Sequence, residues 1–325
     1  MMGRCVWTLA ALLLFFAQPS QADCRLSGVN ASFGTKSSFI INSTPQSTSA
    51  SFSVDCDTVL NLLTSDSIKL TYLGTTPAVI GTGTRGLLRR TDDTTNTDNV
   101  PVMVCALSGC TGGSEIKVGG TYTWSGNSLL DLLASKRYTL PIYLTTVAGQ
   151  NVSAGPYSVI FNFRIDWNIC SLGIAACLAY QTGNGSPGTT VSLTVSNDCS
   201  TITAPAVSFD SAPLVQNFKS VSQSIAITCT KGSTYTVGVN DGLNVNGSVR
   251  RMKSGNNYMS YELYKSNGTD RWGSVGAERW ASAASSGLST DGLLRNYNYV
   301  AKVLTTQTTP PAGTYSDTLV VDVAF

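Results

Sequence analysis

The two segments that decide the fold read AGPYSVIFNFRIDW (residues 154–167) and AGTYSDTLVVDVAF (residues 312–325). Apolar residues occupy every second position of both: Phe161, Phe163, Ile165 and Trp167 in the first, and Leu319, Val321, Val323 and Phe325 in the second. A period of two is typical of a β-strand with one buried face. The repeat therefore predicts two copies of one β-domain. We expect the second copy to stop with this strand, which would leave an unpaired sheet edge open to another chain.

Residues 1–22 have the pattern of a secretory signal peptide. Arg4 supplies the positive charge, and the apolar core from Val6 to Phe16 is too short to cross a bilayer. Ser20-Gln21-Ala22 forms a small-x-small cleavage site. The sequence therefore predicts an exported protein.

Eight cysteines follow this segment, four in each half: Cys24, Cys56, Cys105 and Cys110, then Cys170, Cys177, Cys199 and Cys229. An even number in an exported chain predicts disulfide bonds. The similar spacing of Cys24–Cys56 and Cys199–Cys229 indicates one equivalent bridge in each domain. The pairs Cys105–Cys110 and Cys170–Cys177 would close short loops. Zinc is the alternative for the close pairs, but the chain has no histidine and the pairs lack further ligands.

Short alternating apolar runs, such as residues 68–73 and 191–195, are separated throughout by Ser, Thr, Gly and Asn. This pattern is typical of an all-β sandwich. The length suits two domains of about 150 residues. We place an N-terminal domain at residues 23–167 and a C-terminal domain at residues 168–325. The dipeptides Phe33-Gly34 and Phe209-Asp210 align between the two.

Composition argues against several classes of function. Only 12% of residues are charged and the net charge is +2, without a basic stripe, which disfavours nucleic-acid binding. The lack of histidine excludes Ser-His-Asp and Cys-His catalysis. A two-carboxylate glycosidase is disfavoured because Asp92, Asp93 and Asp98 lie in a Thr/Asn-rich stretch typical of a solvated loop. We expect no enzyme activity, no cofactor and no metal.

The second half carries an ordered series of motifs: CTKG (229–232), RM (251–252), MSYELY (259–264), RWG (271–273) and PAGTYSD (311–317). Together they resemble the spore coat protein U domain, which bacteria use as the subunit of archaic (Csu-type) chaperone–usher pili. The first half keeps the long-bridge cysteines, Phe33-Gly34 and the AGPY segment but lacks the Tyr-x-Leu-Tyr and Trp-Gly elements. Two such domains in one chain resemble the tip adhesin of these pili.

The resemblance implies tandem immunoglobulin-like sandwiches, the C-terminal one an incomplete pilin fold that awaits a donor strand. A periplasmic chaperone would lend that strand during export through an outer-membrane usher, and the N-terminal extension of the next pilin subunit would replace it. The resemblance also implies an extracellular place at the pilus tip. We expect the strand-binding groove to be flanked by Leu319, Val321, Val323 and Phe325. Because Cys24 follows the predicted cleavage site so closely, we expect no donor segment here and a terminal place in the fibre.

A tip adhesin would attach the cell to an abiotic or host surface and promote biofilm formation, and the family's adhesins are thought to use exposed apolar loops. The candidate residues are Val59, Leu60, Leu62, Leu63, Ala78, Val79, Ile80, Leu129 and Leu130. The segment Thr58–Asp66 is preferred because it falls in a length excess over the second copy. The alternatives are a non-adhesive coat or minor pilus subunit, and a secreted carbohydrate-binding protein using Trp124, Tyr122 and Asp131.

Overall fold

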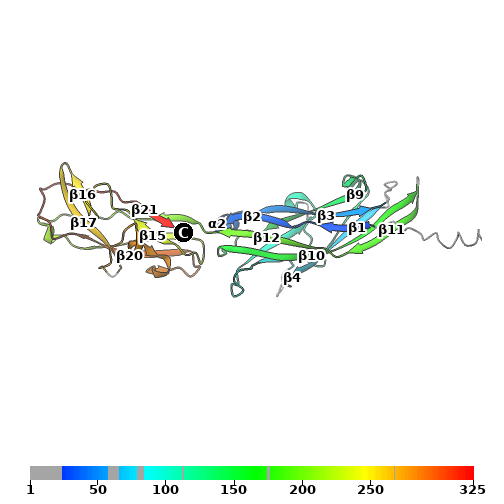
Figure 1. The fold of residues 1–325 in the computed structure, drawn as a ribbon, viewed down its shortest axis with the longest axis horizontal. Coiled ribbons are helices and arrows are strands. Elements are labelled where there is room, and N and C mark those ends of the chain that lie inside the picture. Colours follow the sequence, from blue (N-terminus) through cyan, green and yellow to red (C-terminus); the bar gives the residue numbers. More distant parts are fainter. Residues whose placement is uncertain (1–23, 58–65, 79–83, 112, 174–175, 267) are drawn as a thin grey trace, which may run out of the picture.

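The computed structural model describes residues 24–57, 66–78, 84–111, 113–173, 176–266 and 268–325. It shows two β-sandwiches placed end to end in an elongated molecule (Figure 1). The all-β prediction is confirmed. None of the helices in the described ranges has the length and apolar character needed to span a membrane.

The first sandwich contains β1 (Cys24–Gly28), β2 (Ala31–Ser37), α2 (Ser38–Ser43), β3 (Ser47–Cys56), β4 (Ser67–Thr76), β5 (Gly86–Arg90), β6 (Asn99–Cys105), η1 (Ser108–Cys110), β7 (Thr121–Ser125), α3 (Asn127–Leu130), β8 (Leu133–Ala134), β9 (Arg137–Thr146), β10 (Gly155–Gly173), β11 (Cys177–Gly185) and β12 (Gly188–Ser196). Its main path of paired strands is β1-β3-β9-β6-β5-β10-β12-β2, with β4 and β11 also paired to β10. One apolar core, including Phe52, Tyr72, Phe161 and Phe163, fills the space between the layers.

The second sandwich contains β13 (Cys199–Thr203), η2 (Val215–Asn217), β14 (Val221–Cys229), β15 (Thr236–Val239), β16 (Arg250–Ser254), β17 (Asn257–Lys265), η3 (Gly276–Glu278), β18 (Trp280–Ala281), η4 (Ser282–Ala284), β19 (Gly287–Leu288), β20 (Leu294–Val303) and β21 (Val321–Ala324). One layer has the order β13-β14-β20-β17-β16, with β19 on β20, and the other has the order β18-β15-β21. A separate core is built around Trp272, Trp280 and Tyr297.

The predicted domain boundary at Trp167–Asn168 falls inside the long strand β10. The boundary between the two sets of strands therefore needs a correction. After β10 the chain returns along it as β11 and β12, antiparallel to β10. β12 also pairs in parallel with β2, which makes it the strand that closes the first sandwich. The second set of strands therefore starts at Cys199 rather than at residue 168.

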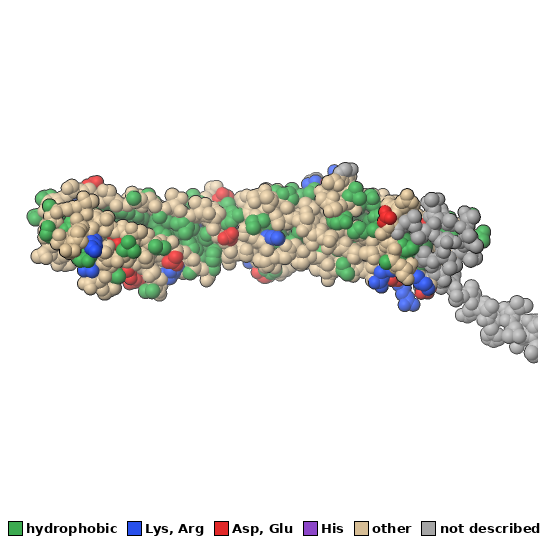
Figure 2. Space-filling model, turned by 90° about the horizontal axis from the view of Figure 1, so that it is seen from above, with side chains coloured by type: hydrophobic (Ala, Val, Ile, Leu, Met, Phe, Trp, Pro, Cys, Tyr) green, Lys and Arg blue, Asp and Glu red, His purple; other side chains and the backbone are tan. Residues whose placement is uncertain are grey.

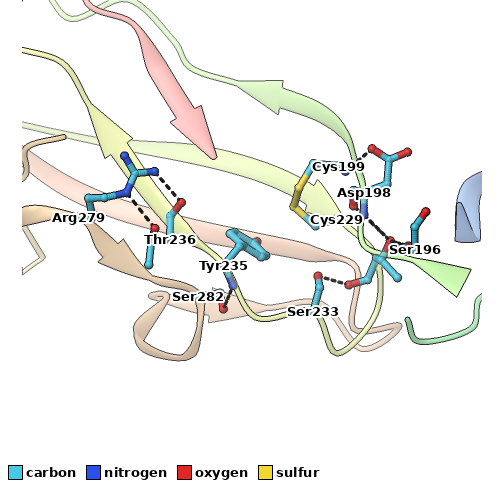
Figure 3. The surroundings of a disulfide bond; sticks show 10 residues. Ser196, Asp198, Cys199, Cys229, Ser233, Tyr235, Thr236, Arg279 and Ser282 are labelled. Carbon is cyan, nitrogen blue, oxygen red and sulfur yellow. Dashed lines mark hydrogen bonds between the residues drawn. A yellow bond between two sulfur atoms is a disulfide. The ribbon is translucent and has the colours of Figure 1, made fainter. Parts of the chain in front are cut away.

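All four predicted disulfides are present: Cys24–Cys56, Cys105–Cys110, Cys170–Cys177 and Cys199–Cys229. The two long-range bridges occupy the same place in each sandwich, since each joins directly opposed residues at one end of an antiparallel pair. In the second sandwich this bridge lies beside the junction, next to Asp198 and Ser196 (Figure 3). The equivalent bridges support the prediction that one β-domain occurs twice.

Candidate functional site

Two tyrosines show that the repeated segments occupy equivalent places. The hydroxyl of Tyr157 donates a hydrogen bond to the carbonyl of Ser153, four residues earlier, over 2.9 Å. The hydroxyl of Tyr315 donates in the same way to the carbonyl of Pro311 over 2.7 Å. The segments around Tyr157 and Tyr315 therefore share this contact as well as their sequence pattern, and we align them on the two tyrosines.

The aligned Phe-Gly and Phe-Asp dipeptides have a matching local geometry as well. Gly34 and Asp210 both adopt a left-handed backbone, with φ of 70° and 58°. Their backbone N–H groups donate to the hydroxyls of Ser32 and Ser208, over 3.0 Å and 3.2 Å. Asp210 can replace glycine there because Asp tolerates the left-handed region better than most residues. These contacts fix a second point of equivalence between the sandwiches.

In the first sandwich the closing strand β12 lies between these two segments. Leu193 is directly opposite Tyr157, and Val191 is opposite both Val159 and Ala31. The inward-facing residues of β12 are fully buried: Thr189, Val191, Leu193 and Val195 are at most 2% exposed. Tyr157 is consequently only 1% exposed.

In the second sandwich no described strand occupies the equivalent place. Equivalent positions are buried in the first copy but only partly buried in the second, where they are Val207, Phe209, Tyr315, Leu319, Val321 and Val323. This comparison within one molecule locates a groove between residues 204–209 and 315–321. Figure 2 shows hydrophobic side chains gathered along the second sandwich.

The groove has a cavity volume of about 380 Å³. Its floor comes from both layers of the sandwich and is mainly apolar: Ile225, Val239, Met252, Tyr261, Leu263, Tyr299 and Ala301. A neighbouring hollow of about 520 Å³ shares Val207, Phe209, Met252 and Tyr315 and extends the groove along residues 208–215. The groove is therefore long and has a mainly apolar floor in its first part, as the binding of an extended peptide requires.

Backbone groups along one wall of the groove are available for pairing. Ser316 exchanges both backbone hydrogen bonds with Lys253, away from the groove. Alternate residues of an extended chain point their N–H and C=O groups to opposite sides. Within the described chain, Tyr315, Asp317 and Leu319 have no backbone hydrogen-bond partner. Such an edge is a template for β-strand addition.

One carboxylate lies in the groove wall. Asp317 accepts hydrogen bonds from the Tyr261 hydroxyl (2.8 Å), the Leu243 backbone N–H (3.0 Å) and the Asn244 amide. Burial, and then the hydrogen bond to Asp317, raise the pKa of Tyr261 above its usual range. The tyrosine is therefore a permanent donor, and the pair fixes the wall to the floor.

A buried ion network supports the far side of this floor. The Arg250 guanidinium is fully buried, pairs with Glu262, and donates to the carbonyls of Val239 and Trp272 over 2.7 and 2.8 Å. Arg271 donates to the other Glu262 oxygen over 2.9 Å. Glu262 belongs to the MSYELY motif and Arg271 to the RWG motif, and Arg250 directly precedes the RM motif, so these segments meet in one structural cluster.

The predicted groove residues are only partly brought together. Leu319 and Val321 line the groove. Val323 packs against the core further along β21. Phe325 is 61% exposed and meets the ring of Tyr235 edge to face, at 5.9 Å between centroids. Sequence reasoning missed the opposite wall, residues 204–209, although Phe209-Asp210 within it repeats Phe33-Gly34.

The predicted apolar loops separate to different places. Val59, Leu60, Leu62, Leu63, Val79 and Ile80 lie outside the described residues. Leu129 is 1% exposed and belongs to the core, so its prediction as an exposed contact residue is wrong. Leu130 ends α3. Ala78 is exposed just after β4, at the end of that strand opposite to Ser67.

The residues considered for carbohydrate binding or glycosidase activity do not come together in one site. Trp124 is buried in the first core and meets the partly buried Tyr122 edge to face, whereas Asp131 is exposed. Asp92 pairs with Arg90 and Asp93 caps a turn at Thr95. Asp98 instead lies at the junction of the sandwiches, where it pairs with Lys231 of the CTKG motif.

Comparisons with known proteins agree with this architecture. The model of the Spore Coat Protein U domain family matches residues 11–162 and 188–322. The chain is similar to the Acinetobacter baumannii CsuC–CsuE chaperone–tip adhesion subunit pre-assembly complex from archaic chaperone–usher Csu pili, with 22% identity, a TM-score of 0.58, and coverage of 93% of this chain and 100% of that one.

A weaker likeness is to the Pseudomonas aeruginosa CupB6 tip adhesin, with 10% identity, a TM-score of 0.34 and 93% of each chain covered. No curated protein sequence matches the chain. The likeness to the Acinetobacter structure shows a shared fold. The family model covers most of both sandwiches. The chain therefore belongs to the Spore Coat Protein U domain family.

Proposed function

We propose that this protein is a non-enzymatic tip adhesin of a chaperone–usher pilus, attached through a strand inserted into the groove of its second sandwich. The observation that carries the proposal is the internal comparison, in which β12 fills the first sandwich while the equivalent groove of the second is open. The similar Acinetobacter protein is described as a tip subunit bound to a chaperone, which supports a periplasmic chaperone as the first partner.

Under this proposal the protein passes through the periplasm and an outer-membrane usher to the extracellular pilus tip. The chaperone strand in the groove is replaced by the N-terminal extension of the next pilin subunit. Backbone hydrogen bonds to the free edge at Tyr315, Asp317 and Leu319 supply affinity, and the apolar floor supplies pockets for alternate side chains.

A self-filled variant tests the attachment. A short turn and an alternating apolar strand are fused after Phe325, so that the added strand folds back antiparallel to β21 as in a hairpin. The second sandwich should unfold at a higher temperature, and the variant should be absent from assembled pili. The control carries the same added residues in scrambled order. Incorporation of the self-filled variant into pili would contradict attachment through the groove.

Adhesion is proposed for the opposite end of the molecule. β11 lies at the end remote from the second sandwich (Figure 1), where Leu178 is 78% and Tyr180 is 44% exposed on alternate positions. An exposed apolar group on a protein of low charge suits contact with apolar abiotic or host surfaces and the formation of biofilm.

Replacement of Leu178 by Asp should reduce attachment to an apolar surface while piliation, counted by microscopy, is unchanged. The matched control is Leu288→Asp, because Leu288 is a 51% exposed leucine on the second sandwich. Unchanged attachment by the Leu178 variant would favour a non-adhesive coat or minor pilus subunit. Inhibition by a specific sugar would favour carbohydrate binding instead.

A further inference from the structure

We propose that the groove selects its strand by register and by side-chain size. The strand runs antiparallel to residues 313–320 and places a branched aliphatic residue opposite Tyr315. It places a large apolar residue opposite Leu319 and a small one opposite Asp317. This inference rests on the proposed function and adds to it the sequence pattern of the partner.

The template for the pattern is the protein's own closing strand. In β12, Leu193 is opposite Tyr157, and Thr189 is opposite Phe161. Side chains at these positions face the core, whereas Thr194, the residue after Leu193, is exposed. The register of β12 against β10 therefore gives the inward-facing residue that lies opposite each position of the wall.

The two equivalences carry this register into the second sandwich. Tyr157 corresponds to Tyr315 through the shared hydroxyl contact, so the position of Leu193 falls opposite Tyr315. The direction follows too, because the wall of each groove runs the same way from its tyrosine. The incoming strand is antiparallel to this wall and parallel to residues 204–209, as β12 is to β2.

Side-chain size changes at one position in favour of a larger partner residue. Phe161 of the first wall corresponds to Leu319 of the second, so the second wall fills less of the interior there. The small Thr189 suffices opposite Phe161, where it is fully buried. Cores conserve total volume across facing positions. Opposite Leu319 the partner therefore needs a leucine-sized side chain.

The neighbouring inward position changes in the opposite sense. In the first sandwich Val191 lies between Val159 of one wall and Ala31 of the other. The corresponding residues of the second sandwich are Asp317 and Val207, so one wall gains two methyl groups and the other presents a carboxylate. A large apolar side chain there would crowd Val207 and lie against a polar group. The partner therefore needs a small residue such as alanine, serine or glycine.

Two peptides of identical composition test the size rule on the full chain. Both have the nine-residue sequence of β12 with two changes. One carries Thr189→Leu and Val191→Ala, and the other carries Thr189→Ala and Val191→Leu. The first should bind about tenfold or more tightly than the second, since it fills the larger space and spares the smaller one. Equal affinity, or tighter binding of the second, overturns the size rule.

Cysteine cross-linking tests register and direction independently of affinity. Ser316→Cys should cross-link to a peptide cysteine at the position of Ser192, and Thr318→Cys to one at the position of Thr190, because these pairs correspond to Ser158–Ser192 and Ile160–Thr190. Cross-linking of Thr318→Cys to the position of Thr194 instead would mean a parallel strand. A shift of both cross-links would mean another register, and either result overturns this inference while strand binding stands. Absence of every cross-link, together with absence of binding, would contradict the proposed function itself.

Discussion

The ammonium of Lys231 and the carboxylate of Asp98 form an ion pair of 2.5 Å across the junction of the two sandwiches. Asp98 is 8% exposed at its side chain and also accepts the backbone N–H of Ser153 over 2.9 Å. The hydroxyl of Thr230, next to Lys231, donates to the carbonyls of Ser196, at the end of β12, and Asp198, in the connecting segment. The CTKG motif therefore fastens the second sandwich to the first.

Replacing Asp98 by Asn should loosen this junction. The exchange removes the ion pair and weakens the hydrogen bond to Ser153, and a hydrogen bond to a charged group contributes about 1.5–3 kcal/mol. Small-angle scattering should show a broader distribution of overall lengths. Asp92→Asn is the matched control, because that exposed carboxylate pairs with Arg90 at the end of β5, within the first sandwich. An unchanged distribution for Asp98→Asn would mean that other contacts fix the junction.

The same carboxylate predicts a loss of stability in acid. Burial opposes the charge on Asp98, but hydrogen bonds from Lys231 and Ser153 outweigh it and hold the pKa of Asp98 below its usual value. The stabilisation is therefore fully present above the unfolded pKa of about 3.9 and is lost as the pH falls through the lower folded pKa. Unfolding free energies of the wild type and Asp98→Asn should converge as the pH falls below the folded pKa of Asp98. A constant difference across that range would exclude this carboxyl as the cause.

The Arg250–Glu262 pair should be essential to the second sandwich. Because Arg250 is fully buried, Glu262→Gln leaves its charge incompletely paired, and breaking a buried ion pair costs about 3–5 kcal/mol. The urea concentration at the unfolding midpoint should fall for the second sandwich and stay unchanged for the first. Glu278 is partly exposed and is an outer partner of Arg271, so Glu278→Gln is the matched control and should have a smaller effect. Equal shifts for the two variants would count against the central role of Glu262.

Leu193→Ala in β12 should destabilise the first sandwich. Leu193 is 1% exposed, and truncation of a buried leucine costs about 2–5 kcal/mol. Thr194→Ala, at the exposed neighbouring position, is the control and should leave stability nearly unchanged. Calorimetry of the full chain separates the two cases. A stable Leu193 variant would show that β12 does not close the first core.

Much of the fold could be predicted from the sequence because the relevant signals are local. The period of two around Phe161 and Val321 and the spacing of the cysteines identify β-strands and their bridges without reference to the rest of the chain. The predicted boundary at Trp167 was wrong because the apolar alternation continues through Ile169. No local signal shows that strand β10 extends beyond the end of the repeated segment.

The site was less predictable because a groove is defined by two walls distant in sequence. Residues 204–209 carry few alternating apolar residues, and their role follows only from the place of Phe209 opposite Tyr315 across the groove. Leu129 shows the complementary difficulty. Its apolar neighbours in the sequence suggest an exposed adhesive loop. Leu129 is instead buried in the core, and its burial depends on strands that are distant in sequence.

The junction also determines how the molecule carries tension. β12 passes through Asn197 and Asp198 into Cys199, the first residue of β13, which is disulfide-bonded to Cys229 at the end of β14 (Figure 3). A pull along the long axis acts lengthwise on β12, so its hydrogen bonds to β10 and β2 share the load in shear rather than opening one after another. Beyond Cys199 the force passes through a covalent bond into β14, and β13 is protected from being peeled away.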